Sequence, residues 1–387
     1  MGMFEKTKKI TGPIVGATFA FVVFVTSLFG NYIITLSLPL ITVLNKHRLW
    51  RDLMDRAATF WMVIPLFFLK FVFRIKVRVT GDEVLYGSPA VVVMNHRTRL
   101  DWMYYWLVLW RMNPWLSTSN KIALKQLLKH VPGVGFGMQV QQFIFLKRDL
   151  EVDLPRMTRA VEYYSDMGIP YQILMFPEGT DRTAFTLNRS NEFAKKNGLR
   201  ELKNVLYPRS AGFLHLVKEM RRNNYLEYVY DVTVAYPQDI VQNETDMVIK
   251  GSLPSEVHYH IKRYHVSELP KNEGELNHWL HQIWYEKEQR LEEYYSQKAK
   301  NKRQFNCDDG FIWLRDDFKQ NAVVFYGLCF WVSMVSVYFY HITFMPFVQC
   351  TVVFLVLNYL YIFGRYGSME KLIYTLWEKS TKRVHVV

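Results

Sequence analysis

The sequence predicts an α/β protein, in which a single globular domain with a central, mostly parallel sheet is flanked by N-terminal membrane helices and a C-terminal transmembrane hairpin. Three observations predict this fold class. Long, nearly uncharged segments lie near both ends of the chain. Between them, short apolar runs alternate with helical patterns, which is typical of a parallel sheet covered by helices. Polar residues follow two of these runs directly, and open α/β sheets bind their ligands at such strand ends.

The N-terminal region contains two apolar segments. Residues 14–44 are almost wholly uncharged, and they outnumber the roughly 20 residues that a membrane-spanning helix needs. Residues 57–73 include Pro65 and Lys70. This second run can either span a membrane or lie along its surface.

Two further apolar segments, residues 322–340 and 343–363, lie near the C-terminus and are separated by His341 and Ile342. Each is long enough to cross a membrane, and so short a break predicts a helical hairpin. Two buried core helices are the alternative, which these lengths favour less.

We therefore expect four parts in chain order. They are membrane-anchoring helices in residues 1–74, the α/β domain in 75–318, the transmembrane hairpin in 319–365 and a tail in 366–387.

Within the central part, four short apolar runs predict buried strands at residues 90–94, 143–146, 172–176 and 229–235. Helical patterns predict helices that include residues 102–110, 121–129, 153–167 and 272–296.

The composition narrows the class of partner. The 387 residues include 48 Lys and Arg against 35 Asp and Glu, which gives a formal net charge of +13. A basic surface suits nucleic acid, anionic lipid or a phosphate-bearing ligand. The sequence has no zinc-finger spacing, RNP-like motif or basic helix, so nucleic acid is not expected as a partner. Three cysteines give no disulfide framework.

A histidine and an aspartate follow the first expected strand, in the segment NHRTRLD at residues 95–101. His96 and Asp101 would not share a face of a regular helix, where their separation turns side chains by about 140°. If a helix begins near Thr98, the two can turn toward each other. Asp101 can then hold Nδ1 of the imidazole and leave Nε2 as a general base for a substrate hydroxyl. The alternative is a capping box from Thr98 to Asp101, with His96 an ordinary polar residue.

The second polar segment is FPEGT at residues 176–180, directly after the expected strand 172–176. It places Glu178 at the carboxyl end of that strand, where ligands bind. Gly179 permits close backbone approach, and its N–H or that of Thr180 can face an anion. The alternative is a polar turn after a buried strand.

Basic residues supply candidate contacts for phosphate or CoA. Lys147 and Arg148 end an apolar run, and Arg148 can clamp a lipid phosphate. Lys121, Lys125 and Lys129 recur every four residues and predict one basic stripe on a helix. For both groups the alternative is a set of solvated surface charges.

Two histidines raise the question of a metal. His258 and His260 alternate within an expected strand, so both face the same side. Such a pair can ligate zinc, but only the loosely spaced His265 offers a third ligand. An exposed strand face is the favoured interpretation, and no metal site is expected.

With these segments in place, the chain resembles the membrane-bound glycerolipid acyltransferases, the lysophosphatidic acid acyltransferase superfamily. Four blocks of that superfamily appear in order within residues 90–210. They are N-H-x4-D at Asn95, His96 and Asp101, an apolar strand ending in Arg148, F-P-E-G-T at 176–180, and an apolar strand that reaches Pro208.

The closer resemblance is to the lysocardiolipin acyltransferase-like branch. It rests on NHRTRLDWM at 95–103, FPEGTD at 176–181 and RSNEFAKKNGL at 189–199. Asp181 departs from the wider superfamily, in which many members place Arg or Ser after E-G-T. Arg182 follows it, so the phosphate contacts of E-G-T-R members are not carried over.

The resemblance implies transfer of a fatty acyl group from acyl-CoA to a free glycerol hydroxyl of an anionic lysophospholipid. The acceptors of this branch are lysocardiolipin, lysophosphatidylinositol, lysophosphatidylglycerol and lysophosphatidic acid. His96 is the implied general base and Asp101 orients it. The implied acceptor contacts are Arg148, Glu178, Gly179 and Thr180, and candidate phosphate or CoA contacts are Lys121, Lys125, Lys147 and Arg182.

The resemblance also implies a cellular setting. Acyl-CoA is a co-substrate, and no metal or redox cofactor is expected. The implied location is the endoplasmic reticulum membrane, with several spans and a cytosolic active site. A non-catalytic, lipid-binding membrane scaffold of the same fold is the alternative.

Overall fold

The computed structural model describes residues 2–238, 240–306, 311–312 and 317–381. The chain divides into two compact units, each built from three separate segments. Unit 1 comprises Met1–Phe19, Phe68–Asn120 and Pro170–Asp316, and unit 2 comprises Ala20–Phe67, Lys121–Ile169 and Asp317–Val387. The four-part division in chain order remains a prediction.

Unit 1 contains a mixed sheet with the strand order β5-β2-β6-β7-β1-β8. β2 runs parallel to both β5 and β6, and β1 runs parallel to β7, whereas β6 with β7 and β1 with β8 are antiparallel. The expected α/β class with a mostly parallel sheet is confirmed. The strands are β1 (Lys76–Gly81), β2 (Ala90–Met94), β5 (Gln172–Met175), β6 (Tyr228–Ala235), β7 (Glu256–His265) and β8 (Phe311–Ile312).

β2 occupies a central place in this sheet, and all five of its side chains are fully buried. Its sequence, AVVVM, has no polar position, which is typical of a parallel strand covered on both faces. The expected strands 90–94, 172–176 and 229–235 match β2, β5 and β6 to within one residue.

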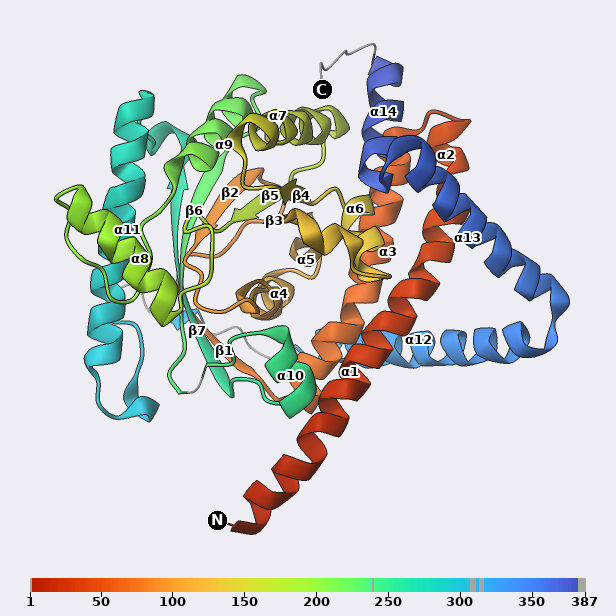
Figure 1. Cartoon of the computed structure of the whole chain (residues 1–387), viewed down its shortest axis with the longest axis horizontal. Helices are drawn as coiled ribbons and strands as arrows, with labels where there is room; N and C mark the ends of the chain where they lie inside the picture. The colour runs from red at the N-terminus through yellow and green to blue at the C-terminus, as the bar shows by residue number, and fades with distance from the viewer. Residues whose placement is uncertain (1, 239, 307–310, 313–316, 382–387) are drawn as a thin grey trace. The chain divides into compact units, whose positions relative to one another are not determined.

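Helices cover both faces of the unit 1 sheet. Tyr105 of α4 packs against Tyr259 of β7, with ring centroids 5.7 Å apart. Lys287 of α11 contacts Asp231 of β6, which points to the other face because side chains alternate along a strand. Figure 1 shows α4 and α11 on opposite sides of these strands. The helices are α4 (Asp101–Met112), α5 (Leu116–Ser119), α8 (Ala184–Lys196), α9 (Ser210–Arg222), α10 (Glu244–Lys250) and α11 (Glu273–Ser296).

Unit 2 combines the parallel strand pair β3 (Asn120–Lys125) and β4 (Ile144–Leu146) with mostly helical segments. α12 packs closely on α3, where Trp331 donates a hydrogen bond to the Phe60 carbonyl at 3.1 Å. A Cβ on Gly327 would lie only 2.7 Å from Val63. The helices are α2 (Pro39–Thr42), α3 (His47–Phe67), α6 (Val134–Val140), α7 (Leu150–Met167), α12 (Phe318–Phe344), α13 (Pro346–Tyr366) and α14 (Met369–Thr381); α1 (Gly2–Ser37) begins in unit 1.

Three helical segments are long and apolar enough to cross a membrane: Thr11–Thr42, Phe318–Phe344 and Pro346–Tyr366. They correspond to the expected spans at 14–44, 322–340 and 343–363. The apolar run 57–73 lies in α3 and the following π-helical turn at Phe68–Val72, and it does not meet these criteria.

The break between α12 and α13 is displaced from its expected place. The sequence suggested His341 and Ile342, but both are helical and the chain leaves the helix at Met345. Met345 has extended dihedral angles, φ −113° and ψ 111°. The reason is Pro346, whose ring disfavours the helical region for the preceding residue and which starts the next helix at its first position.

The expected helix over residues 121–129 is wrong. Residues 120–125 form β3, and a 3₁₀ helix follows at Gln126–His130. Pairing of Ala123 and Leu124 with β4 outweighs the helical spacing of the lysines, so the basic stripe does not exist. Lys121 is instead fully buried, and its Nζ donates to Asp55 at 2.9 Å and Gln141 at 3.0 Å.

The expected exposed face at His258 and His260 is also wrong, because both side chains are buried under α11 and its continuation. His258 lies 2.9 Å from the Tyr294 hydroxyl, and His260 lies 3.1 Å from the Thr80 hydroxyl. Burial lowers the pKa of His260 to about 4. These histidines therefore act as neutral, hydrogen-bonded core residues.

Candidate active site

Three neighbouring strands bring the candidate residues to one edge of the unit 1 sheet. His96 follows β2, Glu178 follows β5 and Tyr236 follows β6. Because β2 lies between β5 and β6 and runs parallel to both, the segments after these strands lie together. A hydrogen bond of 2.7 Å from Arg182 N to His96 O joins the first two segments directly.

Asn95 fixes the point at which the chain leaves β2. Its side chain donates to the Val234 carbonyl at 3.1 Å and accepts from Val234 N at 2.8 Å. The amide therefore continues the pairing of β2 with β6 and satisfies the buried backbone of β6. His96 is the first residue beyond this contact.

His96 and Asp101 form a hydrogen-bonded pair, with Nδ1 of His96 3.0 Å from Oδ2 of Asp101. The Asp101 side chain is fully buried, and His96 is partly exposed. The imidazole stacks on Phe176, with ring centroids 4.1 Å apart. Among the described residues none hydrogen-bonds Nε2 of His96. With Nδ1–H donating to the carboxylate, Nε2 is the atom that can accept a proton.

Asp101 also organises the turn before α4. Its Oδ2 accepts hydrogen bonds from Arg97 N at 2.6 Å and Thr98 N at 2.9 Å, while the Thr98 hydroxyl accepts from Leu100 N at 3.0 Å. α4 begins at Asp101, not near Thr98. The N-cap of α4 is Leu100, which makes no side-chain cap hydrogen bond, so the expected capping box from Thr98 to Asp101 is wrong. Oδ2 of Asp101 instead holds both the imidazole and the backbone of the preceding turn.

Tyr236 completes the surroundings of Asp101, and the sequence did not suggest it as a site residue. Its hydroxyl donates to Oδ1, the oxygen that His96 does not use. Burial, reinforced by the Asp101 charge, raises the pKa of Tyr236 well above its ordinary value. Tyr236 therefore stays protonated and remains a donor. Its only sequence signal is its position directly after a buried strand.

Glu178 lies three residues after the end of β5 and is buried, with 3% of its surface exposed. Burial raises the pKa of Glu178 to about 8, although the backbone N–H groups of Leu206 and His96 and the charge of Lys287 act in the opposite direction. Among the described residues neither carboxyl oxygen makes a hydrogen bond of normal geometry. The side chain is therefore a neutral acid near pH 7.

Gly179 is exposed and Thr180 is half-buried in the FPEGT turn. Gly179 has a φ of +74°, which a residue with a side chain rarely adopts, and its N–H donates to Phe176 O at 2.9 Å. Arg209 lies alongside it, because a Cβ on Gly179 would be 3.5 Å from Cδ and 3.6 Å from Nε of Arg209. The sequence suggested no role for Arg209.

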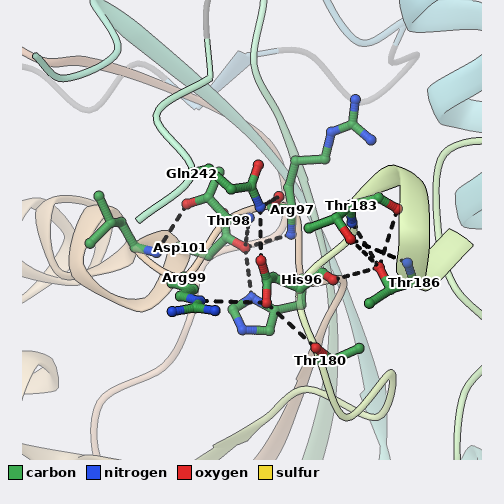
Figure 2. A network of polar contacts seen from close by, with 11 residues as sticks. His96, Arg97, Thr98, Arg99, Asp101, Thr180, Thr183, Thr186 and Gln242 are labelled. Atoms are coloured by element: carbon green, nitrogen blue, oxygen red, sulfur yellow. Dashed lines mark hydrogen bonds and ion pairs between the residues drawn. The ribbon is translucent and has the colours of Figure 1, made fainter. Parts of the chain in front are cut away.

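Asp181 connects three segments at this edge, and Figure 2 shows Arg99, Thr180 and Gln242 of those segments lying close together. Its carboxylate accepts from Gln242 Nε2 at 2.9 Å, lies 3.8 Å from Arg99 Nε and is 3.5 Å from the Thr180 hydroxyl. Gln242 also reaches the Arg97 carbonyl, and Arg99 N donates to the Gln242 carbonyl. The acid that departs from the wider superfamily pattern is thus engaged with protein partners.

Arg182 makes hydrogen bonds to the protein through both its backbone and its side chain. Its backbone N–H binds His96 O, and its guanidinium Nε donates to the Lys203 carbonyl at 2.8 Å.

The predicted apolar strand that reaches Pro208, at residues 205–208, is wrong. The segment is buried but irregular. Glu288 of α11 anchors its start by accepting backbone hydrogen bonds from Lys203, Asn204 and Val205 at 2.8 to 3.1 Å. The sequence did not suggest Glu288, because several glutamates recur along this helix and none is marked as buried.

The remaining candidate cations lie in unit 2. Lys125 pairs in register with Leu146, so Lys125 and Lys147 lie at the carboxyl ends of two adjacent strands. Both lysine side chains are exposed. The Asp153 carboxylate accepts from the backbone N–H groups of Lys147 and Arg148 at 2.8 and 2.7 Å. Arg148 has a φ of +70° and an exposed side chain. A shared site of Arg148 with Glu178 stays a prediction.

Comparisons with known proteins identify the family. The family model described as Acyltransferase matches residues 76–237, and the one described as Acyltransferase C-terminus matches residues 247–309. The first match contains every site residue of unit 1 named above except Gln242 and those of α11.

Curated relatives extend the match. Lysophosphatidylinositol acyltransferase 10 of Caenorhabditis elegans is 47% identical over 96% of this chain and 95% of its own length. Lysocardiolipin acyltransferase 1 of Gallus gallus is 42% identical over 72% of this chain and 73% of its own. The 2-acyl-1-lysophosphatidylinositol acyltransferase of Saccharomyces cerevisiae is 28% identical over 54% and 62%. This chain belongs to the acyltransferase family.

Proposed function

We propose that this chain is an acyl-CoA:lysophospholipid acyltransferase, which moves a fatty acyl group onto a free glycerol hydroxyl of an anionic lysophospholipid. The observation that carries the proposal is the His96–Asp101 pair at 3.0 Å, set at the carboxyl edge of the sheet. The names of relatives that act on lysophosphatidylinositol and lysocardiolipin support this acceptor class.

In the proposed reaction His96 acts as general base. Nε2 takes the proton of the acceptor hydroxyl while the hydroxyl oxygen attacks the thioester carbonyl carbon and forms the new C–O bond. The C–S bond then breaks, which leaves the ester and the CoA thiolate. The imidazolium returns the proton to the departing CoA thiolate. Asp101 holds Nδ1 and stabilises the transient positive charge, as the carboxylate does in a serine-type triad. No acyl-enzyme is required.

The contacts to substrate follow from exposure and charge. The exposed Gly179 and the half-buried Thr180 are proposed to face the acceptor. Glu178, neutral near pH 7, is proposed to orient this turn or donate a hydrogen bond to the acceptor. Arg148, Lys125 and Lys147 are proposed phosphate or CoA contacts.

Two earlier candidate cations receive structural roles instead. Lys121 is buried against Asp55 and Gln141, and burial lowers its pKa to about 8. Arg182 is tied to Lys203.

The membrane setting is part of the proposal. Three helices are long and apolar enough to span, which suits an enzyme whose acceptor and product are membrane lipids. We propose a location in the endoplasmic reticulum membrane with the site facing the cytosol.

The test is an activity matrix of four lysophospholipid acceptors against acyl-CoA donors of several chain lengths, with the purified full chain in mixed micelles. The acceptors are lysocardiolipin, lysophosphatidylinositol, lysophosphatidylglycerol and lysophosphatidic acid. We expect CoA release and ester formation with at least one acceptor, and none with His96→Ala. Binding without turnover across the whole matrix would support the lipid-binding scaffold instead.

A further inference from the structure

We propose that Arg209 provides the positive charge that binds the phosphate of the lipid acceptor and thereby selects phosphate-bearing acceptors. This proposal rests on the proposed function and names a residue for its acceptor site. It starts from the position of Arg209 beside the exposed Gly179 turn, 3.5 to 3.9 Å from where a Gly179 Cβ would stand.

Arg209 lies close to the proposed base. Gly179 lies three residues after Phe176, whose ring stacks on the His96 imidazole with centroids 4.1 Å apart. The turn is also joined to the His96 segment by the bond from Arg182 N to His96 O. A phosphate held at Gly179 would therefore leave the glycerol hydroxyls of the same molecule within reach of His96.

The other arginines at this edge are already engaged. Arg97 lies over the Tyr295 ring at 5.3 Å, Arg99 faces Asp181, and Arg182 donates to Lys203 O. Within the described part of the chain, no carboxylate or carbonyl pairs with the exposed guanidinium of Arg209. An exposed arginine without a protein acceptor, next to a turn whose backbone can approach an anion, is suited to bidentate phosphate binding.

The backbone that carries Arg209 is fixed before any ligand arrives. Arg209 N donates to Pro177 O at 2.7 Å, and Tyr207 N donates to the Ser190 hydroxyl at 3.0 Å. Glu288 holds the start of the same segment through three backbone N–H groups. Only the side chain itself needs to be ordered on binding, which reduces the entropic cost.

Separate KM values for the acceptor and for acyl-CoA distinguish a role of Arg209 in acceptor binding from a general effect on the enzyme. We would measure KM for lysophosphatidylinositol and for acyl-CoA with wild type, Arg209→Gln and Arg209→Lys. Acceptor affinity would be measured independently in the His96→Ala background, in micelles that contain lysophosphatidylinositol. Arg189→Gln, which removes an exposed arginine of α8, is the matched control.

We expect Arg209→Gln to weaken acceptor binding and raise the acceptor KM by about tenfold to a hundredfold, as for a lost charged hydrogen bond. The acyl-CoA KM of Arg209→Gln should stay within about twofold of the wild-type value. The acceptor KM of Arg209→Lys should lie between those of wild type and Arg209→Gln. Both KM values of Arg189→Gln should match those of wild type. An unchanged acceptor KM, or an equal rise in both KM values, overturns the proposal. If Arg209→Gln does not fold, the same criteria apply to Arg209→Lys, which retains charge and stem.

Failure of the proposed function has a different signature. In that case wild type transfers no acyl group to any acceptor, while the effect of Arg209→Gln on lysophospholipid binding in the His96→Ala background can still be read. Loss of binding in Arg209→Gln with no turnover in wild type would leave Arg209 as a phosphate site on a scaffold.

Discussion

At the scale of single residues, the two oxygens of Asp101 have separate partners. Oδ2 binds His96 and two backbone N–H groups, and Oδ1 accepts from the Tyr236 hydroxyl. Loss of that hydroxyl would leave Oδ1 buried without its donor. The carboxylate would then hold the imidazole less firmly in the orientation that catalysis requires.

Tyr236→Phe should therefore lower kcat by about tenfold, the lower end of the range for a hydrogen bond to a charged group. KM for the acceptor should change little, because Tyr236 is buried and does not reach substrate. Steady-state kinetics with one acceptor at several concentrations would separate the two constants.

Tyr104→Phe is the matched control. Its ring lies 6.2 Å from that of Tyr236, and its buried hydroxyl has no hydrogen-bond partner among the described residues. An equal fall in kcat in both variants would mean that the aromatic cluster as a whole matters, and not the hydrogen bond to Asp101.

Glu178 gives a prediction about pH. Its carboxyl ionises near its ordinary pKa of 4.5 in the unfolded chain and near 8 in the folded one. Between these values the folded state binds more protons, so the contribution of Glu178 to stability falls as the pH rises and becomes constant above about 8. Glu178→Gln has no such proton to lose. The free energy of unfolding of Glu178→Gln, relative to that of wild type, should therefore rise between pH 5 and pH 8 by up to a few kcal/mol. Thermal midpoints of both proteins measured across this pH range would show the rise.

The control for Glu178 is the same measurement with Glu192→Gln, an exposed carboxyl on α8. A difference between Glu178→Gln and wild type that does not change with pH would show that the carboxyl titrates normally and is not neutral in the folded protein.

The pairing of His96 with Asp101 could be predicted because the two residues are close together in the chain. His96 and Asp101 lie in one seven-residue segment, and the geometry that joins them needs only a turn and a helix start. Tyr236 meets Asp101 across 135 positions. Nothing in its surroundings marks a buried tyrosine as a partner of that carboxylate, so its role depends on the pairing of β2 with β6.

At the scale of elements, α11 supports the site from one face of the sheet. Lys287 contacts Asp231, and the next residue, Glu288, binds three consecutive backbone N–H groups before Pro208. Both side chains are almost fully buried. One helix therefore carries a buried ion pair with β6 and an anchor for the segment that leads to Arg209.

Glu288→Gln should destabilise the fold by about 2 kcal/mol, because the new amide N–H groups would face backbone donors and leave them unsatisfied. Acyl transfer should fall as the segment before Arg209 loosens. Thermal unfolding and activity should be measured on the same preparations.

Glu292→Gln provides the comparison one turn further along α11. That glutamate is partly exposed, and within the described ranges its ion pairs are with the exposed Arg200 and Lys203. Its loss should therefore change stability by less than about 0.5 kcal/mol. Equal effects of the two substitutions would remove the assigned role of Glu288.

Elements were predicted well where burial and local pattern agree, as in the wholly apolar β2. The helix at 121–129 failed because a spacing of four between lysines also arises by chance along a strand and a 3₁₀ turn. The pairing with β4 makes residues 120–125 a strand. The buried Lys121 is stabilised by Asp55, which lies 66 positions away in the chain. The irregular segment 205–208 is likewise held by a distant helix and not by its own β-propensity.

At the scale of the whole molecule, the chain order differs from the spatial grouping. Each unit gathers three separate segments, and the sequence pattern gave no indication of this, because hydropathy reports local burial and not partners. The three segments that can span a membrane were readable, since their length and lack of charge are local properties.

The central claim is that His96 removes the proton of a lysophospholipid hydroxyl during direct transfer from acyl-CoA. The most direct test is the acceptor-dependent rate of CoA release by wild type and His96→Ala, at equal concentrations of folded, membrane-inserted protein. We predict a fall of about a hundredfold or more in His96→Ala, as expected for the loss of a general base. Full acceptor-dependent activity in His96→Ala would contradict the claim.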